Sequence, residues 1–277
     1  MATTSDTAGT LPKEDERELG PVGLLGAAAL DLYYGGLELY SVFVRTLYYT
    51  ARGRREKGAV VLQLYEVGNK SVFFISITMG FIGMILAYQA GLQAKRVVPD
   101  LTMIGATYME LLVRDLAASL GALMLATRVG AGIAAEIGSM VVTEQVDALR
   151  MCAADPIDFL IVPRFKASLV MTLCLIVWGG LVAFTSGAIT AYVAFEVPLK
   201  TFFNPQLVDF GDLTVGLAKC VAYGAAIPVV SGYCGLSTFG GSEGVGWATT
   251  RAVVNTSLAI IILNFFISSA GFLIFPG

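Results

Sequence analysis

The sequence contains no histidine and few charged residues. Only 14% of its 277 residues are Asp, Glu, Lys or Arg, whereas a soluble domain carries about 25%. Without histidine the commonest general base and the commonest metal ligand are missing, so we expect neither an enzyme nor a metal site. The net charge of −3 gives no indication of nucleic-acid binding.

The chain also lacks a phosphate-binding loop, closely spaced cysteines and an apolar N-terminus. The Gly-rich stretch 237–247 has no βαβ context, and we expect it to be a flexible cytoplasmic turn. Residues 1–20 are polar, so they are not a cleavable signal peptide and are expected to form a disordered tail. The four cysteines are widely spaced and are interpreted as free thiols: Cys152, Cys174, Cys220 and Cys234.

Long apolar runs are abundant, and 56% of the residues are hydrophobic. About 20 apolar residues span a bilayer core, so we expect five transmembrane helices. Their cores are residues 72–92, 116–135, 167–195, 213–236 and 252–275. The predicted fold class is an all-α polytopic membrane protein with its transmembrane domain in residues 58–277.

Residues 21–57 form a separate segment before the first span. Asp31, Glu38, Arg45 and Arg52 recur every seven residues and make one polar stripe on a helix. This pattern favours an amphipathic helix lying in the membrane interface, followed by the basic linker 52–57. The alternative is a sixth span whose stripe faces a protein neighbour.

The positive charges predict an orientation. Segments 45–70, 136–166 and 237–251 hold ten Lys and Arg residues, whereas segments 93–115 and 193–212 hold four. By the positive-inside rule the first group is cytoplasmic, which places the N-terminus in the cytoplasm and the C-terminus outside.

The second span has a small residue at every fourth position. Such a flat face allows close helix packing, either within the chain or between subunits. The residues are Ala118, Ala122, Ala126, Gly130, Ala134 and Gly138.

A charged segment at 135–151 separates the second and third spans. Thr143 is a suitable N-cap, acidic Glu144 and Asp147 follow, and Arg150 lies near the end, an order that suits the helix dipole. A helix this short is unstable alone and needs a surface to rest on. It is either a helical loop packed on its own bundle or a docking helix that receives force from a partner.

Three blocks of sequence resemble one known family. The first, "ATRVGAGIAAEIGSMVVTEQVDALRMCAADPIDFLIVPR" (126–164), contains an acidic-Ile-Gly-x-Met element, Thr-Glu-Gln, Asp-Pro and Pro-Arg. The others are "GFIGMILAYQ" (80–89) and "GVGWATTRAVVNTSLAIIILNF" (244–265). Together they resemble the permease subunits of MCE-type lipid ABC transporters, the MlaE/YrbE family.

The sequence departs from the family pattern at one motif. It has Arg114-Asp115-Leu116-Ala117-Ala118 where the family has Arg-Glu-Leu-Gly-Pro, so the resemblance does not determine the curvature of the second span.

The resemblance implies a homodimeric permease of the bacterial inner membrane that moves phospholipid or related apolar lipid. It also implies cytoplasmic ATPase subunits that hold ATP-Mg, an outer-face MCE-domain protein, and no cofactor in this chain. The charged segment at 136–152 would be the coupling helix. The ATPase-coupling residues would be Glu136, Met140, Thr143, Glu144, Gln145, Asp147 and Arg150.

Charges within the spans are costly in lipid and should find partners. We expect Asp115 to pair with Lys219, and Arg114 to face headgroup phosphate near the outer mouth. The pair could instead only fix the helix register.

A lipid path needs an apolar surface with a few polar groups. The predicted lipid-binding residues are Ile82, Ile85, Tyr88, Gln89, Asn264 and Phe265.

An alternative function is a non-transporting membrane scaffold that anchors outer lipid-binding subunits. An ion-coupled carrier is disfavoured, because the spans lack a trail of titratable groups at the midplane.

Overall fold

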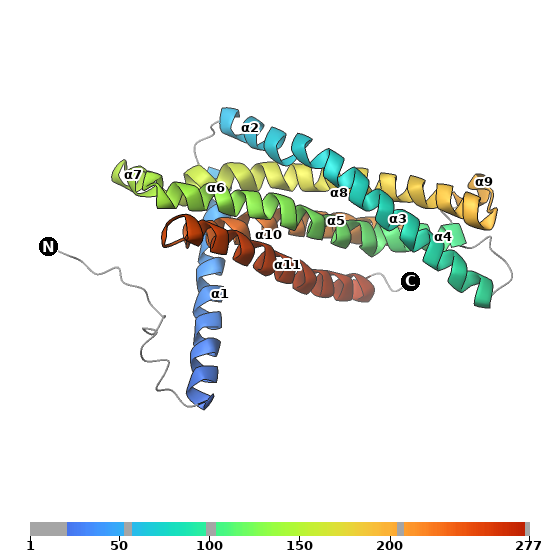
Figure 1. Cartoon of the computed structure of the whole chain (residues 1–277), viewed down its shortest axis with the longest axis horizontal. Helices are drawn as coiled ribbons and strands as arrows, with labels where there is room; N and C mark the ends of the chain where they lie inside the picture. The colour runs from blue at the N-terminus through green and yellow to red at the C-terminus, as the bar shows by residue number, and fades with distance from the viewer. Residues whose placement is uncertain (1–20, 53–56, 98–103, 204–207, 275–277) are drawn as a thin grey trace.

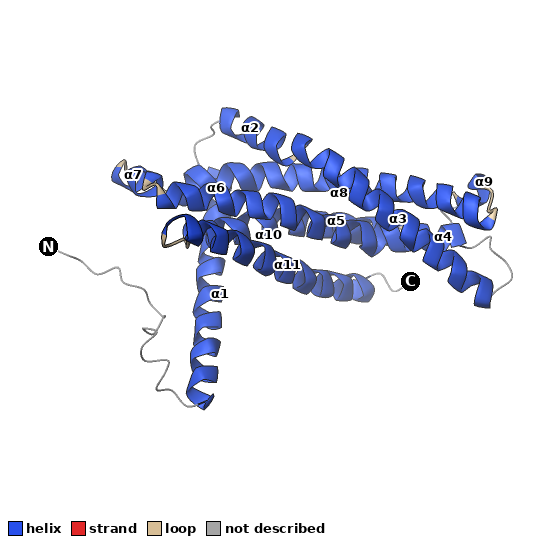
Figure 2. Cartoon of the chain, viewed as in Figure 1, coloured by secondary structure: helices blue, strands red, loops and turns tan. Residues whose placement is uncertain are grey.

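The computed structural model describes residues 21–52, 57–97, 104–203 and 208–274, and over these ranges the chain is helical, without strands (Figure 2). The expected tail 1–20 and residues 53–56 of the basic linker lie outside the described residues.

Five helical stretches are long and apolar enough to cross a membrane, which confirms the expected number of spans. They run from Gly58 to Lys95, Gly105 to Val142, Ile157 to Phe195, Phe210 to Leu236 and Gly241 to Ile274. Stretches of 27 to 39 residues are about 40 to 58 Å long. They therefore extend beyond a hydrocarbon core of about 30 Å or tilt within it.

Each span is built from the following helices. The first is α2 (Lys57–Val67) with α3 (Asn69–Val97), and the second is α4 (Ile104–Leu111), α5 (Ala117–Leu125) and α6 (Ala131–Val142). The third is α8 (Val162–Phe195), the fourth α10 (Phe210–Leu236) and the fifth α11 (Gly241–Ile274). Short helices α7 (Gln145–Met151) and α9 (Leu199–Phe202) lie at opposite ends of the bundle (Figure 1), which we call the α7 end and the α9 end.

Helix α1 (Pro21–Arg52) lies across the α7 end of the bundle instead of along it (Figure 1). Two hydrogen bonds tie it there: Tyr233 donates to Glu38 Oε2 at 2.9 Å, and Tyr49 donates to Asp155 Oδ2 at 2.8 Å. Helix α1 is not among the five spanning stretches. This arrangement supports the interfacial interpretation over a sixth span.

Helix α10 is the most enclosed span and packs against α6, α8 and α11, while α3 packs along α8. Helices α3 and α8 come so close that a Cβ on Gly83 would overlap the backbone of Ala183. Ser186 donates to Gly80 O across the same contact at 2.8 Å. These contacts leave α11 as the span with the least buried surface.

The stripe of small residues on the second span is used inside the chain. All six residues are buried, and α6 packs against α10 and α11 along this face. A Cβ on Gly138 would approach Thr238, and one on Gly130 would approach Ser231. The stripe is therefore explained by intramolecular packing.

Two local predictions were wrong. The predicted turn 237–247 ends at residue 240, where Gly240 and Gly241 adopt positive φ angles of 81° and 73°, and α11 begins at Gly241. Glu243 in the first turn of α11 suits the helix dipole. Thr143 is not an N-cap, because it ends the preceding helix α6 and its hydroxyl donates to Ser139 O at 2.8 Å.

Candidate functional site

The segment between the second and third spans is divided into two helices. Glu136 and Met140 lie on α6, and the left-handed backbone of Glu144, with a φ of 60°, turns the chain into the seven-residue helix α7. The predicted coupling helix 136–152 is therefore not one helix but the end of α6, a tight turn at Thr143 and Glu144, and the short helix α7. Gln145 begins this helix.

Helix α7 rests on the bundle through one apolar side. Val146 is 3% exposed and Leu149 is half-buried. Asp147 and Arg150 are exposed and form an ion pair at 3.2 Å, and Met151 is 89% exposed. The outward face of α7 thus offers acidic, basic and apolar groups to a partner.

An ion pair braces the base of this turn. Arg164 Nη2 of α8 donates to Glu136 Oε2 of α6 at 2.7 Å, and Arg164 Nη1 donates to Leu160 O at 2.7 Å. Arg164 is 5% exposed, so it depends on these partners for its charge. Arg164 was not among the predicted site residues, although the Pro-Arg motif marks it.

Asp155 joins α1 to the same end of the bundle. Its Oδ1 accepts from the backbone N–H of Ile157 at 2.9 Å, and its Oδ2 accepts from Tyr49 at 2.8 Å. The hydrogen bond and the charge of the carboxylate raise the pKa of Tyr49 above its ordinary value of 10.0. The Asp-Pro motif therefore starts the third span and holds α1 in place.

Four charged residues of the second and fourth spans form two neighbouring ion pairs. Lys219 Nζ lies 2.5 Å from Asp115 Oδ1, which confirms the expected pairing. Arg114 Nη1 lies 3.3 Å from Asp212 Oδ1, a partner that the sequence did not indicate. Lys219 is fully buried, while Asp115 and Arg114 are half-buried. The cluster lies roughly 15 Å along these helices from the α9 end.

A π-helical segment, Leu112–Leu116, shapes this cluster. In its wider turn the Ala117 N–H donates to Leu112 O, and the carbonyl of Arg114 accepts from Lys219 Nζ at 3.2 Å. The π-helical segment ends at Leu116, and the regular helix α5 begins at Ala117, the first of the two alanines that stand in place of Gly-Pro. A second π-helical segment, Ala126–Gly130, carries Arg128, which donates to Ser71 Oγ.

A cavity of about 610 Å³ separates the charged cluster from the end of α11. Arg114, Asp115 and Lys219 line one side, and Ser268 and Phe272 line the other. This cavity combines fixed charges with an apolar wall.

The predicted lipid-binding residues do not meet within the chain. Ile82, Ile85, Tyr88 and Gln89 lie on α3, which packs on α8, whereas the last two lie on α11, which packs on α10 and α6. Ile85 and Tyr88 are 60% and 47% exposed on the outer surface of the bundle.

On α11, Asn264 accepts from Tyr223 at 2.9 Å, and Phe265 is 68% exposed. The structure instead encloses an apolar cavity of about 300 Å³ between the second, third and fourth spans. Met109, Phe184 and Leu217 are among the residues that line it.

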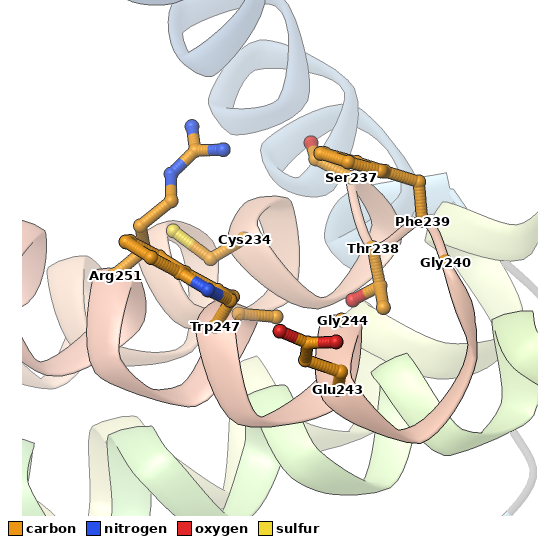
Figure 3. A pocket seen from close by; sticks show the side chains of 10 residues that line it. Cys234, Ser237, Thr238, Phe239, Gly240, Glu243, Gly244, Trp247 and Arg251 are labelled. Carbon is orange, nitrogen blue, oxygen red and sulfur yellow. The ribbon is translucent and has the colours of Figure 1, made fainter.

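Another cavity, of about 540 Å³, lies at the α7 end where α10 turns into α11 (Figure 3). Trp247, Glu243 and Arg251 of α11 line it together with Phe239 of the connecting loop. Trp247 and Phe239 are 68% and 81% exposed, so the hairpin presents aromatic rings at this end.

Comparison with known proteins gives consistent matches. Residues 60–270 match the family described as Permease MlaE. A probable ABC transporter permease protein of Synechocystis is 37% identical over 221 residues, 78% of this chain and 83% of that protein. One from Rickettsia bellii is 35% identical over 215 residues, 77% of this chain and 83% of that protein. The chloroplastic protein TRIGALACTOSYLDIACYLGLYCEROL 1 of Arabidopsis thaliana is 32% identical over 209 residues, 75% of this chain and 59% of that protein.

Five long apolar helices with paired charges within them are the features of a multi-pass α-helical membrane protein, and the family and relatives that the chain matches are permeases. The family match covers all five of these spans. The chain belongs to the MlaE permease family.

Proposed function

We propose that this chain is the membrane subunit of an ABC transporter that moves phospholipid or a related apolar lipid between the inner membrane and MCE-domain partners. A separate ATPase, which holds ATP-Mg, supplies the energy. The single observation that carries this proposal is the exposed charged face of α7 on a braced base between the second and third spans, in a chain of the MlaE permease family.

The geometry of α7 supports a docking role. A seven-residue helix that buries Val146 and exposes Asp147, Arg150 and Met151 has more surface available to a partner than it uses within the chain. The ion pair between Glu136 and Arg164 connects the base of α7 to the second and third spans. A force applied to α7 would therefore reach both spans.

The chemistry of the spans supports a lipid cargo. The cavity beside Arg114 and Lys219 offers charges to a headgroup and an apolar wall to an acyl chain. The Arabidopsis relative is named after a glycolipid, trigalactosyldiacylglycerol, which agrees with a lipid as the transported molecule.

The charge distribution supports an orientation with the α7 end in the cytoplasm. The C-terminus then lies outside, where the α9 end would meet the MCE-domain partner. We place a second copy of the chain against α11, because this span is the least buried and carries exposed apolar residues such as Ile262 and Phe266.

Affinity purification of the tagged chain from its own membranes in mild detergent tests the proposal. We expect the complex to contain an ATPase subunit, an MCE-domain protein and two copies of the chain, and to hydrolyse ATP. A complex that contains the MCE-domain protein but no ATPase would support the scaffold alternative and contradict the transport function.

Topology is tested with Asp147→Cys in a chain that carries Cys152→Ser. An impermeant maleimide should label this cysteine only in inside-out vesicles. Labelling in intact cells would place α7 outside and refute ATPase docking there.

A further inference from the structure

A fourth cavity, of about 1010 Å³, lies at the α7 end where the C-terminal part of α1 meets α2 and the start of the third span. Its volume is at the upper end of the range of about 300–1,000 Å³ for small-molecule sites. None of its lining residues belongs to the outward face of α7 or to the paired charges within the spans. The lining residues are Tyr49, Thr50, Val60, Val61, Cys152, Ala153, Ala154, Asp155, Asp158, Phe159, Val162, Pro163 and Lys166.

Two opposite charges line this cavity without neutralising each other. Neither Asp158 nor Lys166 forms an ion pair or a side-chain hydrogen bond with any part of the chain that the structure describes. Asp155 also lines the cavity, but its two oxygens already accept from Tyr49 and Ile157. The cavity therefore presents one available carboxylate and one available ammonium group.

The remaining wall is apolar and faces outward. Val61 is 64% exposed and Phe159 is 49% exposed, and Val162 lies behind them, almost fully buried. Helix α1 lies across the α7 end of the bundle (Figure 1). With α1 in the membrane interface, as its polar stripe favours, this cavity is at the depth of the lipid headgroups. Charges beside an apolar wall at that depth suit an amphipathic ligand.

We propose that this cavity binds one phospholipid with a zwitterionic, ammonium-bearing headgroup from the leaflet at the α7 end. Lys166 donates to the phosphate, Asp158 accepts from the ammonium group, and Val61 and Phe159 contact the glycerol and the upper acyl chain. With Asp155 and Asp158 the site carries two negative charges against one positive charge, so a headgroup without an ammonium group binds more weakly. This site does not depend on transport, because it lies at the opposite end of the bundle from the charged cluster.

Native mass spectrometry of the full-length chain in detergent tests the site with two probes, dioleoyl phosphatidylethanolamine and dioleoyl phosphatidylglycerol. We expect the ethanolamine lipid to be retained at a concentration about tenfold lower, the effect of one charge-assisted hydrogen bond. Asp158→Asn should abolish this preference, and Lys166→Gln should weaken retention of both lipids. Equal retention of both lipids by the unmodified chain would overturn the proposal.

Matched controls lie at the α9 end. Glu196→Gln and Lys200→Gln remove the same charges from exposed positions and should leave the lipid preference unchanged. If they changed it as much as the cavity variants do, the preference would reflect overall charge and the proposed site would be refuted.

A second measurement needs no substitution. Cys152 lines the cavity and is exposed, so N-ethylmaleimide should modify it more slowly in nanodiscs that contain phosphatidylethanolamine than in nanodiscs of phosphatidylglycerol alone. Peptide mapping separates this thiol from Cys174. Equal rates would contradict the preference for an ammonium-bearing headgroup and would also be the result if a protein segment fills the cavity. Neither readout uses ATP or lipid transfer, so a failure here leaves the proposed transport function standing.

Discussion

Arg164 of α8 holds Glu136 of α6 at 2.7 Å and thereby joins the second and third spans directly below α7. Arg164 is 5% exposed, whereas the side chain of Glu136 is 52% exposed. The pair is therefore a buried cation held by a carboxylate at the surface. Because α7 extends from this base, the pair is well placed to pass movement of α7 to both helices.

Glu136→Gln should lower the stability of the chain. The amide keeps the shape of the side chain but replaces a charge-assisted hydrogen bond by a neutral one, which we expect to cost about 1 kcal/mol given the exposure of Glu136. The measurement is the apparent melting temperature in detergent, with Glu196→Gln as the control. An unchanged melting temperature would show that Arg164 does not depend on Glu136.

Charge reversal on α7 should uncouple the ATPase. The double substitution Glu144→Lys and Asp147→Lys replaces the two acidic side chains on the surface proposed to contact the ATPase by basic ones. We expect ATP hydrolysis by the purified complex to fall about tenfold or more. Glu196→Lys is a matched control, because Glu196 has the same left-handed backbone as Glu144, with φ values of 55° and 60°. Hydrolysis at the wild-type rate in the α7 variant would exclude α7 as the coupling element.

The ion pair within the spans should behave asymmetrically. Asp115→Asn leaves Lys219, which is fully buried, without its counter-charge, and we expect a loss of about 3–5 kcal/mol. Lys219→Met should cost less, because the side chain of Asp115 is 40% exposed and can reach the adjacent cavity.

The double variant Asp115→Asn/Lys219→Met should recover part of the stability lost in Asp115→Asn alone, since no charge is then left unpaired. Thermal unfolding of the three variants in detergent measures this coupling. Purely additive losses would show that the two side chains act independently.

Tyr49 should make the attachment of α1 sensitive to alkaline pH. Its pKa is raised by the hydrogen bond to Asp155 and by the charge of that carboxylate, so its contribution to stability is complete below the unfolded pKa of about 10 and is lost as the pH rises through the higher folded pKa. Tyr49→Phe should remove this dependence. Difference absorption of the phenolate between the wild type and Tyr49→Phe measures the titration, and a midpoint at or below pH 10 would contradict it.

The five spans were predictable, because each has a long run with few or no charges. The residues at which these spans begin and end were less predictable. The apolar core expected for the second span began at Leu116, directly after the charged residues Arg114 and Asp115. The helix continues beyond them because both residues have ion-pair partners on α10. The composition of one segment does not show that its charges are neutralised by charges on another helix.

The candidate site was predictable only in part. The pairing of Asp115 with Lys219 followed from the cost of two lone opposite charges in lipid. Asp212 was missed as the partner of Arg114, because it precedes the apolar run 213–236 and seemed to belong to a loop. The predicted lipid-binding residues lie on two helices that pack against different neighbours, α3 on α8 and α11 on α10 and α6. Helix order in the bundle is not encoded in any single segment, and lipid binding by these residues stays a prediction.

The most direct test of the account is lipid transfer by the chain in proteoliposomes, reconstituted with its ATPase and its MCE-domain partner and carrying a fluorescent phospholipid. We predict transfer of the labelled lipid between the membrane and the MCE-domain partner that requires ATP and stops when α7 carries both charge reversals. Transfer that proceeds equally without ATP, or no transfer from a complex that hydrolyses ATP, would contradict the account.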